Sequence, residues 1–101
     1  EKKITSITKK IVTEYRPSKV ILFGSHAWGT PSDESDSDLF VIKKSSERRI
    51  ERERAVQRIL WGSNVPIDVL VYTPEEIQRR LDIGDFFIEN VLKNGKTLYG
   101  E

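Results

Sequence analysis

The apolar residues change along the chain from helical spacing to short continuous runs. Ile4, Ile7 and Ile11 recur every three or four positions, which predicts an amphipathic helix over residues 4–16 that Pro17 ends. Short apolar or alternating runs, typical of strands that pack at least one face into a core, follow later. These runs predict strands at 19–23, 36–43 and 66–72.

Charged segments with an apolar stripe predict a helix between the second and third strands. Residues 47–61 are rich in charge, but Ile50, Val56 and Leu60 supply a stripe together with Ala55 and Ile59. Ser45 or Ser46 would cap this helix at its start, and Gly62 would end it.

The segment after the third strand has clear helix signals. Thr73 is an expected N-cap, Pro74 suits the first helical position, and Glu76 completes a capping box. Apolar residues between positions 86 and 92 then predict a last helix, which Gly95 ends, and residues 97–99 predict a short edge strand. The order of these elements predicts an α/β (α+β) domain, in which helices pack on a small mixed β-sheet.

Composition narrows the class of protein. The 101 residues predict a single domain over residues 1–101. With 17 basic and 16 acidic residues the net charge is +1, so bulk charge gives no support for nucleic-acid binding. The absence of cysteine excludes disulfides and thiolate metal sites and fits the cytoplasm. No apolar run approaches the ~20 residues of a membrane span.

Three aspartates stand out because they sit in or beside apolar strands. Asp36 and Asp38 are two residues apart, so in a strand they share a face and repel each other. A hard divalent cation such as Mg²⁺ or Mn²⁺ would relieve this repulsion. Asp68 could complete a three-carboxylate cluster if its strand lies beside the second one. The alternatives are an acid-rich loop for the pair, and for Asp68 a strand-edge charge that prevents aggregation.

Gly24 and Ser25 follow the first strand and supply a possible phosphate site. Glycine lets the backbone approach a ligand closely, and a helical turn after it would direct free N–H groups outward. Ser25 adds a hydroxyl donor. The alternative is an ordinary strand-to-helix turn, since neither a Walker sequence nor a dinucleotide fingerprint is present.

The segment GSHAWGTPSDESDSDLFV resembles the signature of the DNA polymerase beta-like nucleotidyltransferase superfamily. Ten residues separate Ser25 from Asp36, an Asp-x-Asp pair follows, and a third acid lies on a later strand. The closest resemblance is to the minimal nucleotidyltransferases, which are often encoded beside a HEPN-domain partner and act as antitoxins. The likeness extends over nearly the whole chain and implies the polymerase beta-like catalytic core.

This resemblance implies a role for each candidate residue. Asp36 and Asp38 would be metal ligands that hold the nucleoside triphosphate, and Asp68 would share a second ion and favour deprotonation of the attacking hydroxyl. Gly24 and Ser25 would bind the β- and γ-phosphates. Two Mg²⁺ or Mn²⁺ ions would then support the transfer of AMP from ATP, with release of pyrophosphate.

Two positions depart from the commoner family pattern. Trp28 stands where arginine is frequent, and Ser37 stands between the aspartates where an aliphatic residue is common. Neither change removes a metal ligand, but Trp28 removes a possible cationic contact, so the substrate preference stays open. His26 is interpreted as a surface-turn residue rather than as a base.

Other notable residues favour structural roles. The segment ERRIERERAVQR interleaves acids and bases, which is more typical of a solvated helix face with i,i+4 pairs than of a polynucleotide-binding surface. Trp61, Phe86 and Phe87 are predicted to lie in the core rather than to stack on bases. Any exposed part of them could contact a partner.

Three functional hypotheses remain from the sequence. The first is an enzyme that moves AMP from ATP to a hydroxyl of a partner protein, as the antitoxin resemblance implies, with a tyrosine of a HEPN-type toxin as the typical acceptor. The second is an antitoxin that neutralises its partner by binding alone. The third is a nucleotidyltransferase acting on a small molecule or RNA. Residues 1–101 hold the core alone, so we expect another protein, either a HEPN-type partner or a second copy, to supply the acceptor.

Overall fold

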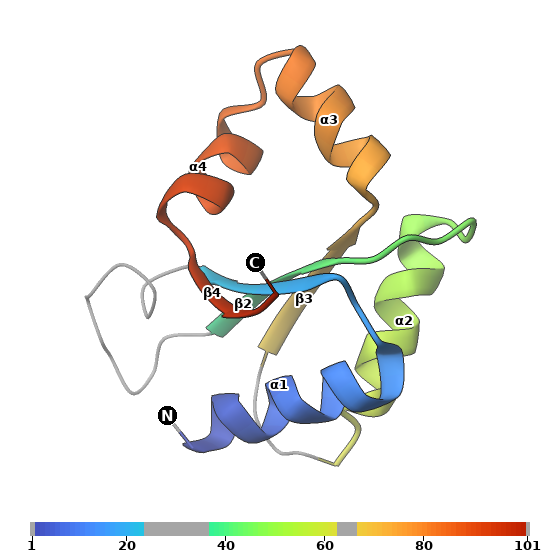
Figure 1. Cartoon of the computed structure of the whole chain (residues 1–101). Coiled ribbons are helices and arrows are strands. Elements are labelled where there is room, and N and C mark those ends of the chain that lie inside the picture. The colour runs from blue at the N-terminus through green and yellow to red at the C-terminus, as the bar shows by residue number, and fades with distance from the viewer. Residues whose placement is uncertain (1, 24–36, 63–66, 101) are drawn as a thin grey trace.

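The computed structural model describes residues 2–23, 37–62 and 67–100 (Figure 1). Helices and strands follow one another in these residues in the order that the sequence predicts. The elements are α1 (Lys2–Tyr15), β1 (Lys19–Phe23), β2 (Ser37–Ile42), α2 (Arg49–Ile59), β3 (Ile67–Tyr72), α3 (Pro74–Asp82), α4 (Phe86–Asn94) and β4 (Lys96–Tyr99). In this part of the chain, no helix is long and apolar enough to cross a membrane.

The strands form one mixed sheet in the order β3-β2-β1-β4. β1 pairs antiparallel with both β2 and β4, whereas β2 and β3 run parallel. The predicted small mixed sheet is therefore confirmed. β3 is an edge strand, and its only sheet neighbour among the described residues is the strand that carries Asp38.

Helices cover both faces of the sheet, with α1 and α2 on one side and α3 and α4 on the other (Figure 1). The alternation of side chains along the central strands supplies both layers. Toward α1 and α2 the core contains Ile4, Ile7, Ile11, Val20, Leu22, Leu39, Val41, Val56, Leu60, Ile67, Val69 and Val71. Toward α3 and α4 it contains Ile21, Phe23, Phe40, Tyr72, Ile77, Ile88 and Val91.

The helix predicted at the start of the chain is confirmed, and its end has a clear cause. The N–H of Arg16 donates to the carbonyl of Val12, and Arg16 takes a left-handed conformation with φ of 54°. Pro17 disfavours helical dihedrals in the residue before it. The chain therefore leaves α1 at this point and enters β1.

The start of α3 has the predicted capping box. The hydroxyl of Thr73 accepts from the N–H of Glu76, and the carboxylate of Glu76 accepts from the N–H of Thr73. Because two otherwise unpaired donors are satisfied in this way, the helix begins at a fixed position beside the end of β3.

α2 differs from its prediction at its start and in its buried stripe. Arg48 is the N-cap and forms no side-chain cap, while the hydroxyl of Ser45 accepts from the N–H of Glu47 outside the helix. The predicted serine cap is therefore wrong. Ile50 is exposed, and Arg52 takes the buried position one turn before Val56.

The prediction of a core position for the late aromatic residues is wrong for all three. Trp61 is 86% exposed and Phe86 is 82% exposed. Trp61 lies beyond the end of α2, and α4 buries Ile88 and Val91 instead of its first residue. Phe87 is partly exposed, and its ring meets the Phe23 ring edge-on at 5.5 Å between centroids.

Candidate functional site

Asp38 and Asp68 are register partners on the neighbouring parallel strands β2 and β3. Register partners in such a ladder have their side chains on the same face of the sheet. Asp38 is half-buried and Asp68 is exposed. The structure therefore brings two of the three predicted acids side by side, near the first residues of their strands.

Both aspartates lie at one end of the apolar layer that α3 and α4 cover. Phe23 on β1 is the register partner of Asp38, and Phe40 and Leu70 follow the two acids on the same face. The Phe23 and Phe40 rings pack edge-on with centroids 6.4 Å apart. This packing orders the strand ends from which the carboxylates project.

The other predicted site residues lie outside the described part of the chain. These are Asp36, Gly24 and Ser25, together with His26 and Trp28. Residues 2–23, 37–62 and 67–100 contain no group of three His, Cys, Asp or Glu side chains that could hold a metal ion. A three-carboxylate cluster would thus need Asp36, and its formation stays a prediction.

Asp38 and Asp68 line an open cavity of about 500 Å³. Its wall also includes a stripe of α2 at spacing i, i+3, i+4 and i+7, which is one face of a helix. The remaining lining residues are Phe23, Ile50, Glu53, Arg54, Gln57, Val69 and Leu70. From the sequence, Ile50 was predicted to lie in the apolar stripe of this helix and its charged neighbours on a solvated face, although the spacing of the four residues was a signal of a shared face.

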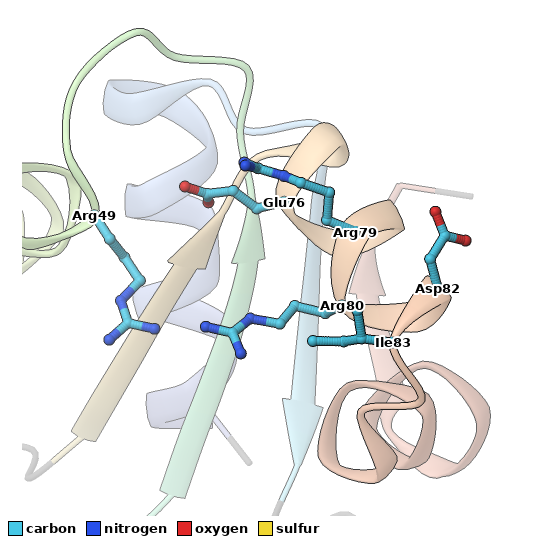
Figure 2. A pocket seen from close by; sticks show the side chains of 6 residues that line it. All are labelled: Arg49, Glu76, Arg79, Arg80, Asp82 and Ile83. Atoms are coloured by element: carbon cyan, nitrogen blue, oxygen red, sulfur yellow. The ribbon is translucent and has the colours of Figure 1, made fainter.

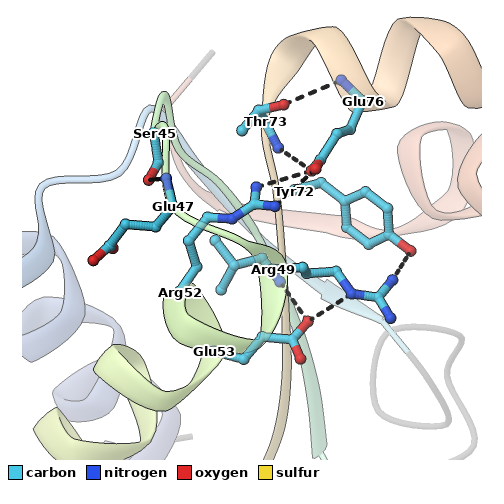
Figure 3. A network of polar contacts seen from close by, with 9 residues as sticks. Ser45, Glu47, Arg49, Arg52, Glu53, Tyr72, Thr73 and Glu76 are labelled. Carbon is cyan, nitrogen blue, oxygen red and sulfur yellow. Dashed lines mark hydrogen bonds and ion pairs between the residues drawn. The ribbon is translucent and has the colours of Figure 1, made fainter.

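Side chains of α2 bind the open edge of β3 and so fix the wall of this cavity. The Glu53 carboxylate accepts from the N–H of Val71 at 3.3 Å, and Gln57 Nε2 donates to the carbonyl of Ile67 at 3.4 Å. Glu53 also lies 3.5 Å from Arg49 Nε (Figure 3). An edge strand that has its outward-facing groups occupied is less available for pairing with another chain.

A buried ion pair joins α2 to α3 behind this wall (Figure 3). The two Nη groups of Arg52 donate to the two carboxylate oxygens of Glu76, each at 2.8 Å, and Arg52 is only 1% exposed. These hydrogen bonds, helped by the N–H of Thr73 and opposed by burial, lower the pKa of Glu76 to about 2. Sequence reasoning missed this pair, because arginine is rarely buried.

The donor chemistry of the aspartate pair fits a hard divalent cation. Carboxylate oxygens are the ligands that Mg²⁺ and Mn²⁺ prefer, and two carboxylates leave coordination positions for water and phosphate. The cavity beside Asp38 and Asp68 is open, so a ligand can reach both side chains. The described lining has neither histidine nor cysteine, which would favour softer metals.

Sequence comparison relates the chain to nucleotidyltransferases. The model of the nucleotidyltransferase domain family matches residues 2–98. A candidate protein adenylyltransferase of Methanocaldococcus jannaschii is 28% identical over 104 residues, which covers 98% of this chain and 97% of that relative. The family resemblance that the sequence carries is therefore confirmed.

Solved structures share the fold. A candidate nucleotidyltransferase from Sulfolobus solfataricus superposes with a TM-score of 0.69 at 22% identity and covers 99% of this chain and 79% of its own. A toxin–antitoxin structure, a mutant of MntA-HpeT, superposes with a TM-score of 0.63 at 21% identity. The alignment covers 97% of this chain and 72% of the chain in that structure. From the family match over residues 2–98, the chain belongs to the nucleotidyltransferase domain family and is a nucleotidyltransferase.

Proposed function

We propose that this chain transfers AMP from ATP to a hydroxyl group of a partner protein. The observation that carries the proposal is the pairing of Asp38 with Asp68 at the rim of an open cavity, in a chain of the nucleotidyltransferase family. The relative from Methanocaldococcus jannaschii, a candidate protein adenylyltransferase, supports a protein as the acceptor.

Asp36, Asp38 and Asp68 would hold two Mg²⁺ or Mn²⁺ ions. When bound, such ions stabilise negative charge on the attacking and leaving oxygens. Gly24 and Ser25 would bind the β- and γ-phosphates of ATP. Asp68 would favour loss of the proton from the acceptor hydroxyl. The acceptor oxygen then forms a bond to the α-phosphorus, the bond from the α-phosphorus to the bridging oxygen breaks, and pyrophosphate leaves.

The proposed acceptor protein is a HEPN-type toxin that this chain would neutralise as its antitoxin in the cytoplasm. The fold shared with a toxin–antitoxin structure is consistent with such a pair. A second copy of this chain is the other candidate for an acceptor. Either protein could reach the aspartate pair, because the described residues hold this pair in an open rather than an enclosed cavity.

Label transfer tests this function. The purified chain is incubated with soluble protein from its source cell, Mg²⁺ and ATP labelled on the α-phosphate, and a parallel reaction contains ATP labelled on the γ-phosphate. We expect one protein band to gain the α-label and none to gain the γ-label from this enzyme. The variants Asp38→Asn and Asp68→Asn should transfer no label above background.

The alternative functions predict different outcomes of this experiment. Label that enters RNA, or a small molecule, in the absence of protein acceptors would contradict the proposal and identify the corresponding class of acceptor. If no label is transferred, yet the chain neutralises a toxin with which it is co-expressed, the chain is an antitoxin that acts by binding.

A further inference from the structure

Three arginines from two helices surround a second open cavity, of about 570 Å³ (Figure 2). Arg49 comes from the start of α2, and Arg79 and Arg80 come from the last turn of α3. Figure 2 shows Arg49 and Arg80 extending toward each other in front of the strands. The lining also contains Glu76, Asp82 and Ile83.

Arg49 is held in place before any ligand binds. Its Nη1 donates to the hydroxyl of Tyr72 at 2.8 Å, and its guanidinium lies 5.3 Å from the centroid of the Tyr72 ring. Glu53 lies 3.5 Å from its Nε on the other side. Because these contacts order the side chain in advance, binding of a carboxylate or phosphate costs less conformational entropy.

The lining has three arginines and two acids, and one of these acids is already neutralised by an arginine outside the lining, so the cavity keeps an excess of positive charge. Glu76 receives both Nη groups of Arg52, and Asp82 accepts from Gln78 Nε2 at 3.0 Å. Arg80 has its nearest described acid, Asp85, at 3.9 Å, which is a long ion pair. An anionic group that enters this cavity would therefore meet arginines with donors to spare.

Ile83 adds an apolar side chain to this cavity at the α3–α4 corner, and hydrogen bonds order the turn that follows it. Ile83 is 74% exposed at the cavity, and Phe86, three residues later, is also exposed. Gly84 has φ of 79°, its N–H donates to Leu81, and the N–H of Asp85 donates to Arg80, which is the Schellman pattern. The Asp85 carboxylate then caps α4 by accepting from two N–H groups.

We propose that the cavity lined by Arg49, Arg79 and Arg80 docks an acidic and apolar segment of the acceptor protein. This inference rests on the proposed function. Arginine binds carboxylates with two parallel hydrogen bonds, and exposed apolar side chains beside arginines are typical of protein interfaces. A polynucleotide would need a wider cationic surface than three arginines, and the whole chain has a net charge of only +1.

The distance along β3 between this cavity and the aspartate pair indicates how far an acceptor protein must reach to contact both. Tyr72, which holds Arg49, lies four residues after Asp68 on the same face of β3, or ~13 Å at about 3.3 Å per residue. The Arg49–Glu53 pair joins the two cavities, since Arg49 lines one and Glu53 lines the other. An acceptor that reaches from the aspartate pair to Arg49 would thus span on the order of 13 Å.

A binding experiment without ATP or metal tests the docking site. The probe is a 12-residue peptide of alternating glutamate and leucine with one tyrosine, titrated into the ¹⁵N-labelled chain. We expect its addition to shift the amide resonances of Arg79, Arg80 and Ile83. Arg79→Gln/Arg80→Gln should weaken binding at least tenfold, whereas Arg58→Gln/Lys10→Gln, which removes two charges elsewhere, should not.

Further outcomes separate this proposal from other possibilities. A peptide with glutamine in place of glutamate should not bind at these residues. The proposal is overturned if the acidic peptide leaves these resonances unchanged, if both double variants weaken binding equally, or if a 12-nucleotide RNA binds there more tightly. Thermal melting of each variant checks its folding, and Ile83→Asp, which keeps all the arginines, should also weaken binding.

Failure of the docking proposal can be told apart from failure of the proposed function. The Asp68→Asn variant should bind the acidic peptide as the unaltered chain does, because Asp68 lies in the other cavity. The Arg79→Gln/Arg80→Gln variant should still bind ATP with Mn²⁺. Peptide binding without any label transfer would leave the docking site standing and reject the transferase function, and the reverse result would reject docking alone.

Discussion

Arg52 and Glu76 form a two-pronged ion pair, with both N–O distances at 2.8 Å, although Arg52 is almost fully buried. The pair fastens α2, which lines the cavity of the aspartate pair, to α3, which lines the arginine cavity. Glu76 also caps α3 through Thr73. One carboxylate thus sets the spacing between the walls of the two candidate sites.

Removal of Glu76 should destabilise the fold more than removal of Arg52. Glu76→Ala leaves a buried guanidinium without its partner, which costs about 3–5 kcal/mol. Arg52→Met removes the buried charge and keeps much of the volume, while Glu76 retains some exposure to water, so we expect a loss of about 1–2 kcal/mol. Urea unfolding measures both losses. Equal losses, or the reverse order, would contradict this account of the pair.

The same pair makes stability depend on pH in the acidic range. The pKa of Glu76 falls from 4.5 to about 2 on folding, mainly because of the hydrogen bonds from Arg52. A lowered pKa stabilises the fold above pH 4.5, and this stability is lost as the pH falls toward 2. At about 1.4 kcal/mol per pH unit the loss amounts to about 3 kcal/mol. Unfolding curves recorded between about pH 6 and pH 2 measure this loss of stability.

The Arg52→Met variant is the control for that pH dependence. Without the guanidinium, the pKa of Glu76 should return toward its ordinary value, so the contribution of this group to the pH dependence should shrink. A variant whose stability falls as steeply with acid as that of the unaltered chain would assign the effect to other carboxylates.

Two substitutions of Asp68 separate its catalytic role from a role as an edge-strand charge. Asp68 is exposed on an edge strand, so Asp68→Asn and Asp68→Lys should each change stability by less than about 0.5 kcal/mol. Lysine keeps a charge at the edge but cannot bind a divalent cation. If Asp68 is a ligand, both variants lose at least ~100-fold in transfer rate.

The alternative for Asp68 predicts a different pair of results. If the residue only prevents aggregation, Asp68→Lys should transfer AMP normally, and Asp68→Asn should aggregate while its soluble fraction stays active. Light scattering and label transfer on the same samples distinguish the two roles.

A comparison of a buried with an exposed aromatic residue tests the burial of these side chains through the free energy of unfolding. Phe40 is buried between Phe23 and Tyr72, and its ring stacks on that of Tyr72 at 5.1 Å between centroids. Phe40→Ala should therefore cost about 3–5 kcal/mol. Trp61→Ala should cost less than about 0.5 kcal/mol, because this side chain lies in solvent. A large loss of stability in Trp61→Ala would contradict the exposure of this side chain and indicate that it lies in the core.

Most of the fold follows from periodicity and from turn and cap signals. The helix with Ile4, Ile7 and Ile11, the third strand and the capping box of Thr73 and Glu76 are read from local sequence and are confirmed. Strand order and direction are not local properties. That β2 and β3 run parallel, with Asp38 opposite Asp68, depends on how α2 crosses between them.

The errors of sequence reasoning occur where chemistry alone was used to predict burial. Arg52 is charged but buried, because Glu76 from another element compensates it, and a single helix cannot reveal that partner. Trp61 and Phe86 are apolar but exposed, because each lies at a helix end. The aspartates were recognised because side chains alternate between the two faces of a strand, a rule that can be applied to the sequence without knowing the tertiary structure. Asp36, Gly24 and Ser25 lie outside the described residues, so their predicted roles depend on the resemblance and the sequence pattern.

Paramagnetic broadening by Mn²⁺ tests the central claim most directly. Mn²⁺ is added at low concentration to the ¹⁵N-labelled chain with a non-hydrolysable ATP analogue. We predict that the amide signals of Asp36, Asp38 and Asp68 broaden first, that broadening is much weaker without the nucleotide, and that Asp68→Asn reduces it. Broadening centred on other residues, or unaffected by the loss of Asp68, would contradict a metal–nucleotide site at the paired strands.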